Sequence, residues 1–444
     1  MISQKYQNEI DHYIANTPKS RALQEKAAQF LPGGSTRGAA FYDPYPVFID
    51  KGQGNYLYDV DGNKYLDFVI NATSLILGHA NPLIVNALQD QALKGTAYSA
   101  PAESQIRLAK LLCDRIPSVD TIRFTNSGTE ATLNAMRAAR AFTGRHKVAK
   151  FEGLYHGTHE YVEVSVHPPS DALNENETIS ILEFPGQSPS LVDDVIVLPF
   201  NNLEESSRII RQHHKELACV IMEAVVSEFG YIPANIEFLK GIRDLTTELG
   251  ILLIFDEVQS FRVAPGGAQE MFGVIPDLTA LGKIVGGGMP AGAFGGREDV
   301  MALYGSPGKK PVIPHAGTFN GNPMTMVAGE VVMNQLTPHV YEPLNRLGEI
   351  LRRKLRAIFD ELEMPVQITG VASFFGINIT DNEITNYRSK LLRNQELNDL
   401  LFIGLVNEGV MIQSSGDGAL STLTTEAEID EFADAVRRVI QRIR

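Results

Sequence analysis

The sequence has no tryptophan, only two cysteines and no excess of basic residues among its 444 positions. Cys113 and Cys219 lie far apart, each within an apolar periodic segment, and are expected to be buried free thiols. No apolar run is long enough to cross a bilayer. The net charge of −14, from 39 Lys and Arg against 53 Asp and Glu, would repel nucleic acid and anionic lipid. We therefore expect a small-molecule partner, with neither nucleic acid nor membrane involved.

The first 30 residues are polar and have helical spacing, unlike the basic and then apolar pattern of a secretory signal. A cytoplasmic protein is therefore expected. The hydrophobic fraction of 44% and charged fraction of 21% are typical of a globular chain. At about 150 residues per domain, the length allows roughly two to three domains.

Apolar strands alternate with amphipathic helices through the middle of the chain. Strands are predicted at 121–125, 194–200, 217–226 and 251–258, with helices between them at 130–144, 203–216 and 238–250. This alternation is typical of a largely parallel sheet covered by helices on both faces. The predicted fold class is therefore α/β.

The two ends of the chain follow another pattern. One helix is predicted to end before Leu31, followed by strands near 47–50 and 56–68 with a hairpin turn at Asp61-Gly62. Beyond about Gly329, long helices enclose strands between 366 and 380, which indicates a smaller α+β domain. The predicted domains are an N-terminal segment of the small domain at 1–75, a large domain at 76–329, and a C-terminal small domain at 330–444.

One segment interrupts the alternation. His167 to Asp194 is rich in Pro, Ser, Asn and Glu, and it is too long and polar for an ordinary connection. We expect a mobile lid or a surface excursion there, which could gate a site.

A candidate phosphate site follows the strand at 121–125. Ser127, Gly128 and Thr129 open a helix, where free backbone N–H groups, two hydroxyls and a glycine suit a phosphate. The same residues would serve equally well as an N-cap with a capping glutamate at position 130. Taken alone, the cap is the simpler interpretation.

The apolar strand at 251–258 ends in Asp256 and Glu257, at an edge where ligands bind in open α/β sheets. A nucleotide hydrolase also has an acidic pair there, but its phosphate loop should precede the strand. The one candidate, Gly282-Lys283, follows it and has Ile284 in place of Ser or Thr. Lys283 lies between an apolar stretch and a glycine-rich loop, where desolvation would favour a neutral, nucleophilic amine.

Motifs along nearly the whole chain carry a family resemblance: PGGSTR, YLYDVDGNKYLDF, LGHANP, FTNSGTEA, FEGLYHG, IFDEVQSFRV, PDLTALGKIVGGGMPAGAFGG and AGTFNGNP. The sequence resembles the class III aminotransferases of pyridoxal 5'-phosphate (PLP) fold type I, in the branch of glutamate-1-semialdehyde aminomutase and the β-amino-acid aminotransferases. The resemblance implies PLP as the cofactor and a large, mostly parallel-sheet domain beside a smaller α+β domain built from the two termini. It also implies a homodimer with active sites shared between subunits. No metal site is expected.

The resemblance assigns the central chemistry to two residues. Lys283 would hold PLP as a Schiff base and then carry a proton between the substrate and the cofactor. Asp256 would pair with the pyridine nitrogen and keep it protonated. His156 is expected to be structural.

The remaining cofactor contacts follow from the same motifs. Ser127, Gly128 and Thr129 would hold the phosphate, which Thr318 would reach from the other subunit. Tyr155 would stack on the cofactor ring, with Val258 against the opposite face. Glu223 matches a family glutamate near the cofactor, although alanine replaces the proline that usually follows it.

Three features of the sequence bear on which substrate the protein binds. Arg37 could grip a carboxylate through two parallel hydrogen bonds, and an ordinary surface arginine is the alternative. The aminomutase resemblance predicts a tryptophan soon after the strand at 56–68, but Asn71 to Ser74 occupy that stretch. Ser415 occupies the place of an arginine that β-amino-acid aminotransferases can carry.

Two hypotheses follow within PLP chemistry. The leading one is an aminotransferase that moves an amino group between a carboxylate-bearing amino acid, such as a β-amino acid, and a keto acid or aldehyde. The alternative is an intramolecular aminomutase or an amino-acid racemase, which needs no separate acceptor. A nucleotide hydrolase, disfavoured by its motif order, and a non-catalytic binding module of the same fold lie outside this chemistry.

Overall fold

The computed structural model describes residues 2–173 and 178–444, which form two compact units. Unit 1 comprises Met1–Asn81, Pro343–Glu383 and Arg393–Arg444, and unit 2 comprises Pro82–Glu342 and Ile384–Leu392. Unit 1 is thus assembled from three separate parts of the chain. In the described ranges, no helix combines the length and apolar character that spanning a bilayer requires.

A seven-stranded sheet with the order β4-β12-β11-β10-β7-β5-β6 forms the centre of unit 2. Strand β12 is antiparallel to β4 and β11, whereas the other neighbouring strands are parallel. The strands are β4 (Thr121–Thr125), β5 (Lys147–Phe151), β6 (Val195–Leu198), β7 (Leu217–Met222), β10 (Leu252–Asp256), β11 (Leu278–Gly282) and β12 (Gly292–Gly296). A separate antiparallel pair joins β8 (Val225–Val226) to β9 (Ile232–Pro233). The predicted α/β class, with a largely parallel sheet, is confirmed.

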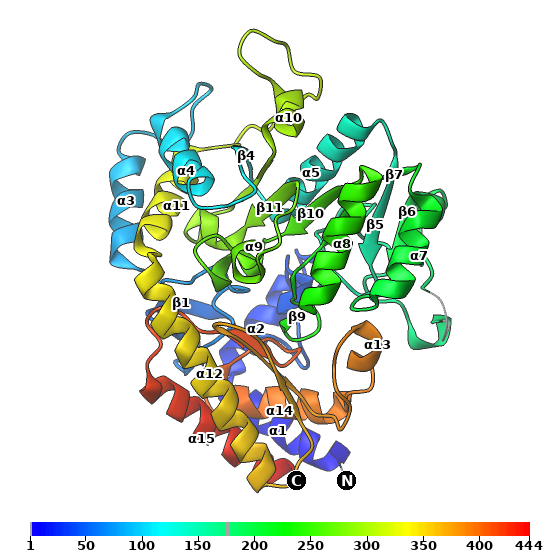
Figure 1. Ribbon diagram of the computed structural model, residues 1–444. Coiled ribbons are helices and arrows are strands. Elements are labelled where there is room, and N and C mark those ends of the chain that lie inside the picture. Colours follow the sequence, from blue (N-terminus) through cyan, green and yellow to red (C-terminus); the bar gives the residue numbers. More distant parts are fainter. Residues whose placement is uncertain (1, 174–177) are drawn as a thin grey trace. The chain divides into compact units, whose positions relative to one another are not determined.

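Helices pack against this sheet, as Figure 1 shows for α5, α7 and α8 beside the strands. The helices of unit 2 are α3 (Pro82–Ala92), α4 (Glu103–Cys113), α5 (Gly128–Thr143), α6 (Leu191–Asp194), α7 (Leu203–His213), α8 (Ile236–Leu249), α9 (Ala268–Phe272), α10 (Glu298–Met301), α11 (Pro323–Gln335) and α13 (Tyr387–Lys390). Short 3-10 helices are η3 (Ser170–Ala172), η4 (Ser260–Val263), η5 (Lys283–Gly286) and η6 (Ala302–Tyr304).

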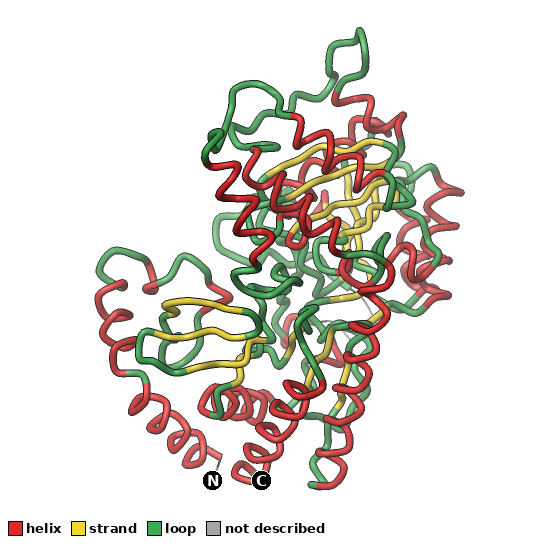
Figure 2. The backbone as a smooth tube through the Cα atoms, turned by 90° about the vertical axis from the view of Figure 1, so that its left-hand side faces the viewer, coloured by secondary structure: helices red, strands yellow, loops and turns green. Residues whose placement is uncertain are grey.

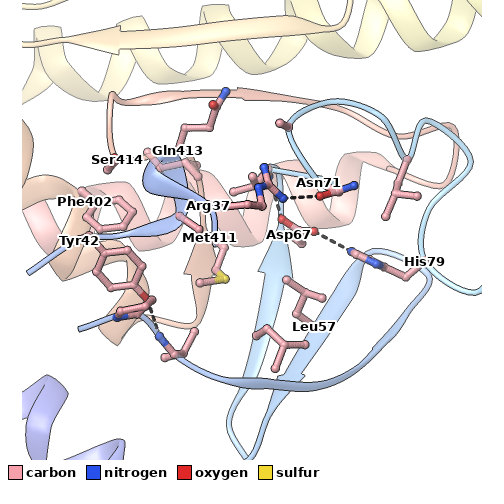
Figure 3. A pocket seen from close by; sticks show the side chains of 18 residues that line it. Arg37, Tyr42, Leu57, Asp67, Asn71, His79, Phe402, Met411, Gln413 and Ser414 are labelled. Atoms are coloured by element: carbon pink, nitrogen blue, oxygen red, sulfur yellow. Dashed lines mark hydrogen bonds and ion pairs between the residues drawn. The ribbon is translucent and has the colours of Figure 1, made fainter. Parts of the chain in front are cut away.

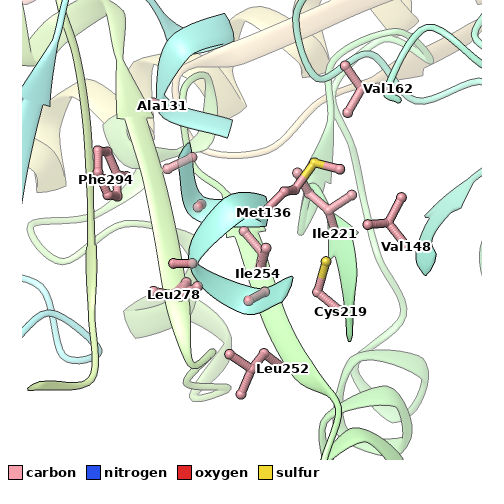
Figure 4. Close-up of a cluster of buried hydrophobic side chains, with 14 of the residues drawn as sticks. Ala131, Met136, Val148, Val162, Cys219, Ile221, Leu252, Ile254, Leu278 and Phe294 are labelled. Carbon is pink, nitrogen blue, oxygen red and sulfur yellow. The ribbon is translucent and has the colours of Figure 1, made fainter. Parts of the chain in front are cut away.

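The core under α5 explains why that helix lies close to the sheet. Small side chains such as Ala131 and Ala135 line its buried face, and Met136 packs among strand residues that include Val148 and Ile254 (Figure 4). All six residues of β7 and all five of β10 are buried, as expected for strands covered on both faces. This packing fixes the N-terminus of α5 relative to the strand ends.

Unit 1 holds two smaller sheets. One has the order β1-β2-β3-β15, in which β15 is parallel to β3, and the other is the antiparallel set β13-β14-β16. The strands are β1 (Ile49–Gln53), β2 (Tyr56–Asp59), β3 (Lys64–Asp67), β13 (Gln367–Thr369), β14 (Phe374–Asn378), β15 (Val410–Met411) and β16 (Asp417–Ala419). Figure 2 shows these strands in yellow with red helices beside them. The predicted hairpin at Asp61-Gly62 joins β2 to β3 and is confirmed.

The helices of unit 1 come from both ends of the chain. They are α1 (Ile2–Asn16), α2 (Pro18–Ala27), α14 (Gln395–Asn407) and α15 (Glu426–Ile443), with 3-10 helices η1 (Pro32–Gly34) and η2 (Gly38–Ala40). Helix α12 (Pro338–Glu361) belongs to unit 1 from Pro343 onward. The blue α1 packs against the orange α14 (Figure 1). The prediction of a single helix ending before Leu31 is wrong. Pro18 has no N–H to continue α1, and it begins α2 instead.

The predicted excursion at 167–194 is partly described, and residues 174–177 within it lie outside the described residues. The Oγ1 of Thr178 donates to the Val197 carbonyl, and the Oγ of Ser180 donates to the Val195 carbonyl, both at 2.6 Å. These bonds run along β6, which is the last strand of its sheet. The described part therefore covers a sheet edge that would otherwise be open.

The two thiols differ in exposure. Both are free, and Cys219 is buried in β7, where burial raises the pKa of its thiol to about 12. Cys113, at the end of α4, is only half-buried, so the prediction of a buried thiol is wrong there. The helix ends at this residue and leaves it near the surface.

Candidate active site

The candidate catalytic residues meet at the carboxyl ends of the unit 2 strands. Lys283 begins η5 directly after β11, with a φ of 50°, a left-handed conformation that is uncommon for residues with a Cβ. Its side chain is half-buried. A Cβ on the neighbouring Gly282 would lie 3.1 Å from a methyl carbon of Val258, a tight contact that Val258 would have to relieve. The backbone strain is concentrated on the residue that the motifs identify as the nucleophile.

Asp256 ends β10 and is 4% exposed. Its Oδ1 accepts from the backbone N–H of Val258 at 3.0 Å, and its Oδ2 lies 2.9 Å from Nδ1 of His156. His156 is also buried, and burial lowers the pKa of its imidazole although Asp256 opposes that shift. The neutral ring then donates Nδ1–H to the carboxyl group of Asp256 and fixes its orientation. This contact gives His156 a part in positioning Asp256, in keeping with the expectation that it is structural.

The N-terminus of α5 has two backbone N–H groups to offer. The Oγ of Ser127 caps the helix by accepting from the N–H of Glu130 at 3.1 Å. The N–H groups of Gly128 and Thr129 have no hydrogen-bond partner among the residues that the structure describes. A Cβ at Gly128 would lie 2.9 Å from a methyl carbon of Val258, so the backbone approaches the strand end closely. The N-cap and the phosphate interpretations thus apply to different atoms of one turn.

Tyr155 lies on a turn that contacts the same helix. The Oγ1 of Thr129 accepts from the N–H of Thr158 at 3.1 Å, and the Oγ1 of Thr132 donates to the His156 carbonyl at 2.7 Å. The side chain of Tyr155 is 40% exposed, so part of its ring is open to a ligand. Burial of the rest, together with nearby Glu163 and Glu228, raises the pKa of its hydroxyl.

Glu223 supplies a buried polar atom without a partner. Its Oε1 accepts from the Ser227 hydroxyl at 2.9 Å, whereas its Oε2 has no hydrogen-bond partner. The side chain is 2% exposed, and burial with the nearby charge of Asp256 raises the pKa of the carboxyl well above its usual range. A protonated Glu223 could donate to a ligand atom. The Nε2 of His156 is likewise buried and unpartnered.

Glu228 is a nearby carboxylate to which sequence reasoning gave no role. It lies within electrostatic reach of Lys283, and its Oε2 is 3.8 Å from Nε2 of His167. Burial alone would raise the pKa of Glu228, but His167 and Lys390 lower it overall. Glu183 and Glu228 together raise the pKa of His167 to about 9. No motif marks Glu228, since it follows the short strand β8 in an irregular stretch.

The segment Ile384–Leu392 braces the turn that leads to Tyr155. The guanidinium of Arg388 donates to both oxygens of Glu152, at 2.7 and 3.0 Å. The hydroxyl of Tyr387 donates to the Pro168 carbonyl at 3.0 Å, and its ring fills the space where a Cβ on Gly153 would lie, within 2.4 Å. Gly153 has a φ of 78°, which a side chain would also disfavour.

Replacing Arg388 with methionine should lower the free energy of unfolding by about 2–3 kcal/mol, because it leaves the Glu152 carboxylate buried without its cation. The Glu152 side chain is 5% exposed and that of Arg388 is 29% exposed. Urea denaturation would measure the loss. In the matched control, Arg211→Met, the Arg211–Glu248 pair has both side chains more than half exposed, so the loss of stability should be much smaller than for Arg388→Met. Equal losses in the two variants would contradict the prediction.

The predicted site residues fall into two groups. Unit 2 brings together Ser127, Gly128, Thr129, Tyr155, Glu223, Asp256, Val258 and Lys283. Thr318 belongs to the same unit but lies exposed, in the stretch before α11. Arg37 belongs to unit 1, where it lines a cavity described below.

Comparisons with known proteins identify the family of the chain. The model of the class-III aminotransferases matches residues 38–440. A glutamate-1-semialdehyde 2,1-aminomutase of Methanothermobacter thermautotrophicus is 42% identical, over 89% of this chain and 92% of its own.

Two solved structures are similar in both fold and sequence. An omega-transaminase from Sphaerobacter thermophilus has a TM-score of 0.92 and 41% identity, covering 96% of this chain and 97% of its own. A β-phenylalanine aminotransferase from Variovorax paradoxus has a TM-score of 0.90 and 35% identity, covering 99% of this chain and 98% of its own. The chain therefore belongs to the class-III aminotransferases, a family of PLP-dependent enzymes.

Proposed function

We propose that the enzyme transfers an amino group from a carboxylate-bearing amino acid, such as a β-amino acid, to a keto acid or aldehyde. When bound, PLP supplies an aldehyde that captures the amine and a protonated ring that accepts the electron pair of a deprotonated carbon. The unpartnered Oε2 of Glu223 and the free N–H groups at the start of α5 suit such a ligand.

Lys283 would hold the cofactor covalently through Nζ and afterwards accept and return a proton at that atom. Asp256, oriented by His156, would hold a proton on the ring nitrogen. The backbone of residues 127–129 would bind the phosphate. Tyr155 and Val258 would cover the two faces of the ring.

We further propose a cytoplasmic homodimer. Thr318 of the partner subunit would complete the phosphate site, since Thr318 is exposed in the single chain and precedes the N-terminus of α11. The exposed side chain of Phe319, beside it, would be covered in the same contact.

A cavity in unit 1 supports the proposed substrate. It has a volume of about 440 Å³, within the usual range for small-molecule sites. Most of its lining is apolar and includes Tyr42, Phe402 and Met411, while Arg37 supplies a guanidinium (Figure 3). A cation on an apolar wall suits a carboxylate attached to a hydrocarbon or aryl group.

Arg37→Met should therefore lower kcat/KM for 3-amino-3-phenylpropanoate about 100-fold, the loss of roughly one charged bidentate contact. For 1-phenylethylamine, which has no carboxylate, kcat/KM should change less than about threefold. Initial rates with pyruvate as the acceptor would measure both. Equal losses for the two amines would contradict a carboxylate role for Arg37.

The identities of 42% to an aminomutase and 41% to a transaminase do not by themselves choose between transfer and rearrangement. A single half-reaction separates them. With amine donor and no acceptor, a transaminase releases one keto product per site. An aminomutase or racemase would release none, and an aminomutase would convert glutamate-1-semialdehyde without any acceptor.

A further inference from the structure

A left-handed turn forms one wall of the cavity that Arg37 lines. Ile70, Asn71, Ala72 and Thr73 have φ values of 40°, 51°, 51° and 72°. Each L-residue in this region costs roughly 1–2 kcal/mol, because its Cβ crowds the backbone. Two of the four are β-branched, for which the conformation is especially unfavourable. Such a run persists only where the surroundings hold it.

Asp67, at the end of β3, holds the start of this turn. It is 3% exposed, and its Oδ1 accepts from the N–H groups of Val69 and Ile70 at 2.8 and 3.0 Å. Its Oδ2 lies 2.7 Å from Nε2 of His79 (Figure 3). The N–H of Leu75 closes the turn by donating to the Ile70 carbonyl at 3.0 Å. The turn is therefore fixed at both ends.

The turn presents Asn71 to Arg37. The Oδ1 of Asn71 accepts from Nη1 of Arg37 at 2.7 Å, and its Nδ2 donates to the Ser74 hydroxyl at 3.0 Å. That hydroxyl in turn donates to the Asn71 carbonyl at 2.9 Å. Because the Ser74 hydroxyl donates elsewhere and accepts from Nδ2, the side-chain amide has one preferred orientation, with its oxygen toward the guanidinium.

The charge of Arg37 is not neutralised by this contact. Among the described residues, no carboxylate forms an ion pair with Arg37. Asp67 lines the same cavity, but both of its oxygens are engaged by the turn and by His79. An amide oxygen orients a guanidinium, whereas a carboxylate would also cancel its charge.

We propose that Asn71 is a specificity-determining residue, which orients Arg37 toward the cavity while leaving the full positive charge for a substrate carboxylate. The inference rests on the proposed function. An aspartate of the same shape at position 71 would form an internal ion pair with Arg37, and the site would then favour amines that have no carboxylate.

Asn71→Asp tests this directly, because asparagine and aspartate both tolerate the left-handed conformation. We expect kcat/KM for 3-amino-3-phenylpropanoate to fall about 10- to 100-fold, mainly through a higher KM. For 1-phenylethylamine it should change less than about threefold. The control Asn8→Asp adds the same charge at an exposed position of helix α1 and should change neither value.

Asn71→Gly provides a second variant, since glycine adopts positive φ without strain. It removes the acceptor and keeps the charge of Arg37, so the loss with the carboxylate substrate should be smaller than in Asn71→Asp. An equal or larger loss in the glycine variant would overturn the charge argument, and so would an unchanged KM in Asn71→Asp.

Arg37→Met separates this inference from the proposed function. If Arg37→Met loses the preference for carboxylate substrates and Asn71→Asp keeps it, the role of Asn71 fails while that of Arg37 stands. If Arg37→Met keeps the preference, the substrate proposal itself fails.

Discussion

Lys283→Ala is expected to reduce turnover by at least about 10³-fold, since both the covalent hold on the cofactor and the mobile proton depend on its Nζ. The loss should not come from unfolding. Lys283 is half-buried at the start of η5, and alanine removes its long side chain without adding bulk. Steady-state rates with a saturating amine would measure the effect.

Borohydride reduction followed by peptide mass analysis gives a second measurement. The native chain should carry reduced cofactor on Lys283, and the alanine variant should carry none while still binding PLP reversibly. Lys240→Ala, an exposed lysine in α8, is the control and should behave as the native enzyme does. Normal turnover in Lys283→Ala would remove the basis of the whole assignment.

Asp256→Asn is the second substitution with a large expected effect. The asparagine keeps the shape and can still accept from the N–H of Val258, but it has no charge to hold a proton on the ring nitrogen. We expect kcat to fall about 10²- to 10⁴-fold. The measurement is a single-turnover rate on enzyme loaded with PLP.

Glu257 provides the matched control, since it is the next carboxylate on the same strand end. Its oxygens accept from the N–H groups of Ala268 and Gln269 and from the Ser260 hydroxyl, so it fastens the start of α9. Glu257→Gln should lower stability and leave the turnover of the folded enzyme within about threefold. Similar losses of turnover in both variants would mean that Asp256 has no special role.

Much of the sheet could be predicted because its strands are apolar runs bounded by helices. Strands β7 and β10 are of this kind. Strand β12 could not be predicted, since Gly-Ala-Phe-Gly-Gly has little strand propensity. Its glycines are required by neighbours, because a Cβ on Gly292 would lie 2.0 Å from the Ser127 carbonyl oxygen. Strand β5 could not be predicted from the sequence either, since it has the buried Lys150 near its centre.

Lys150 in β5 shows why a charged residue within an apolar run can mislead a strand prediction. The ammonium of Lys150 donates to the Val164 carbonyl at 2.6 Å, and burial lowers its pKa to about 7. A charged residue in a strand normally indicates an exposed position. Here the carbonyl of Val164, 14 positions further along the chain, supplies the partner, and no pattern within the strand itself reveals it.

The residues of the candidate site also differ in whether the sequence could identify them. Residues with a motif around them, such as Lys283 and Asp256, could be identified from local spacing. Asn71 and Arg388 could not be assigned roles, because each acts through a partner that is remote in sequence. For Asn71 the partner is Arg37, 34 positions away, and for Arg388 it is Glu152, 236 positions away.

The interleaving of the two units constrains the order in which the chain can fold during synthesis, and it constrains how the units could be produced separately. The first 81 residues of unit 1 must wait for Arg393–Arg444 before α1 can pack on α14. Unit 2 is complete only when Ile384–Leu392 arrives, since Arg388 is the cation that pairs with Glu152. Folding cannot proceed one unit after the other from the N-terminus, as it does in tandem-domain chains. Neither unit can be expressed from one uninterrupted stretch of the gene, so separation would require splicing its parts with new linkers.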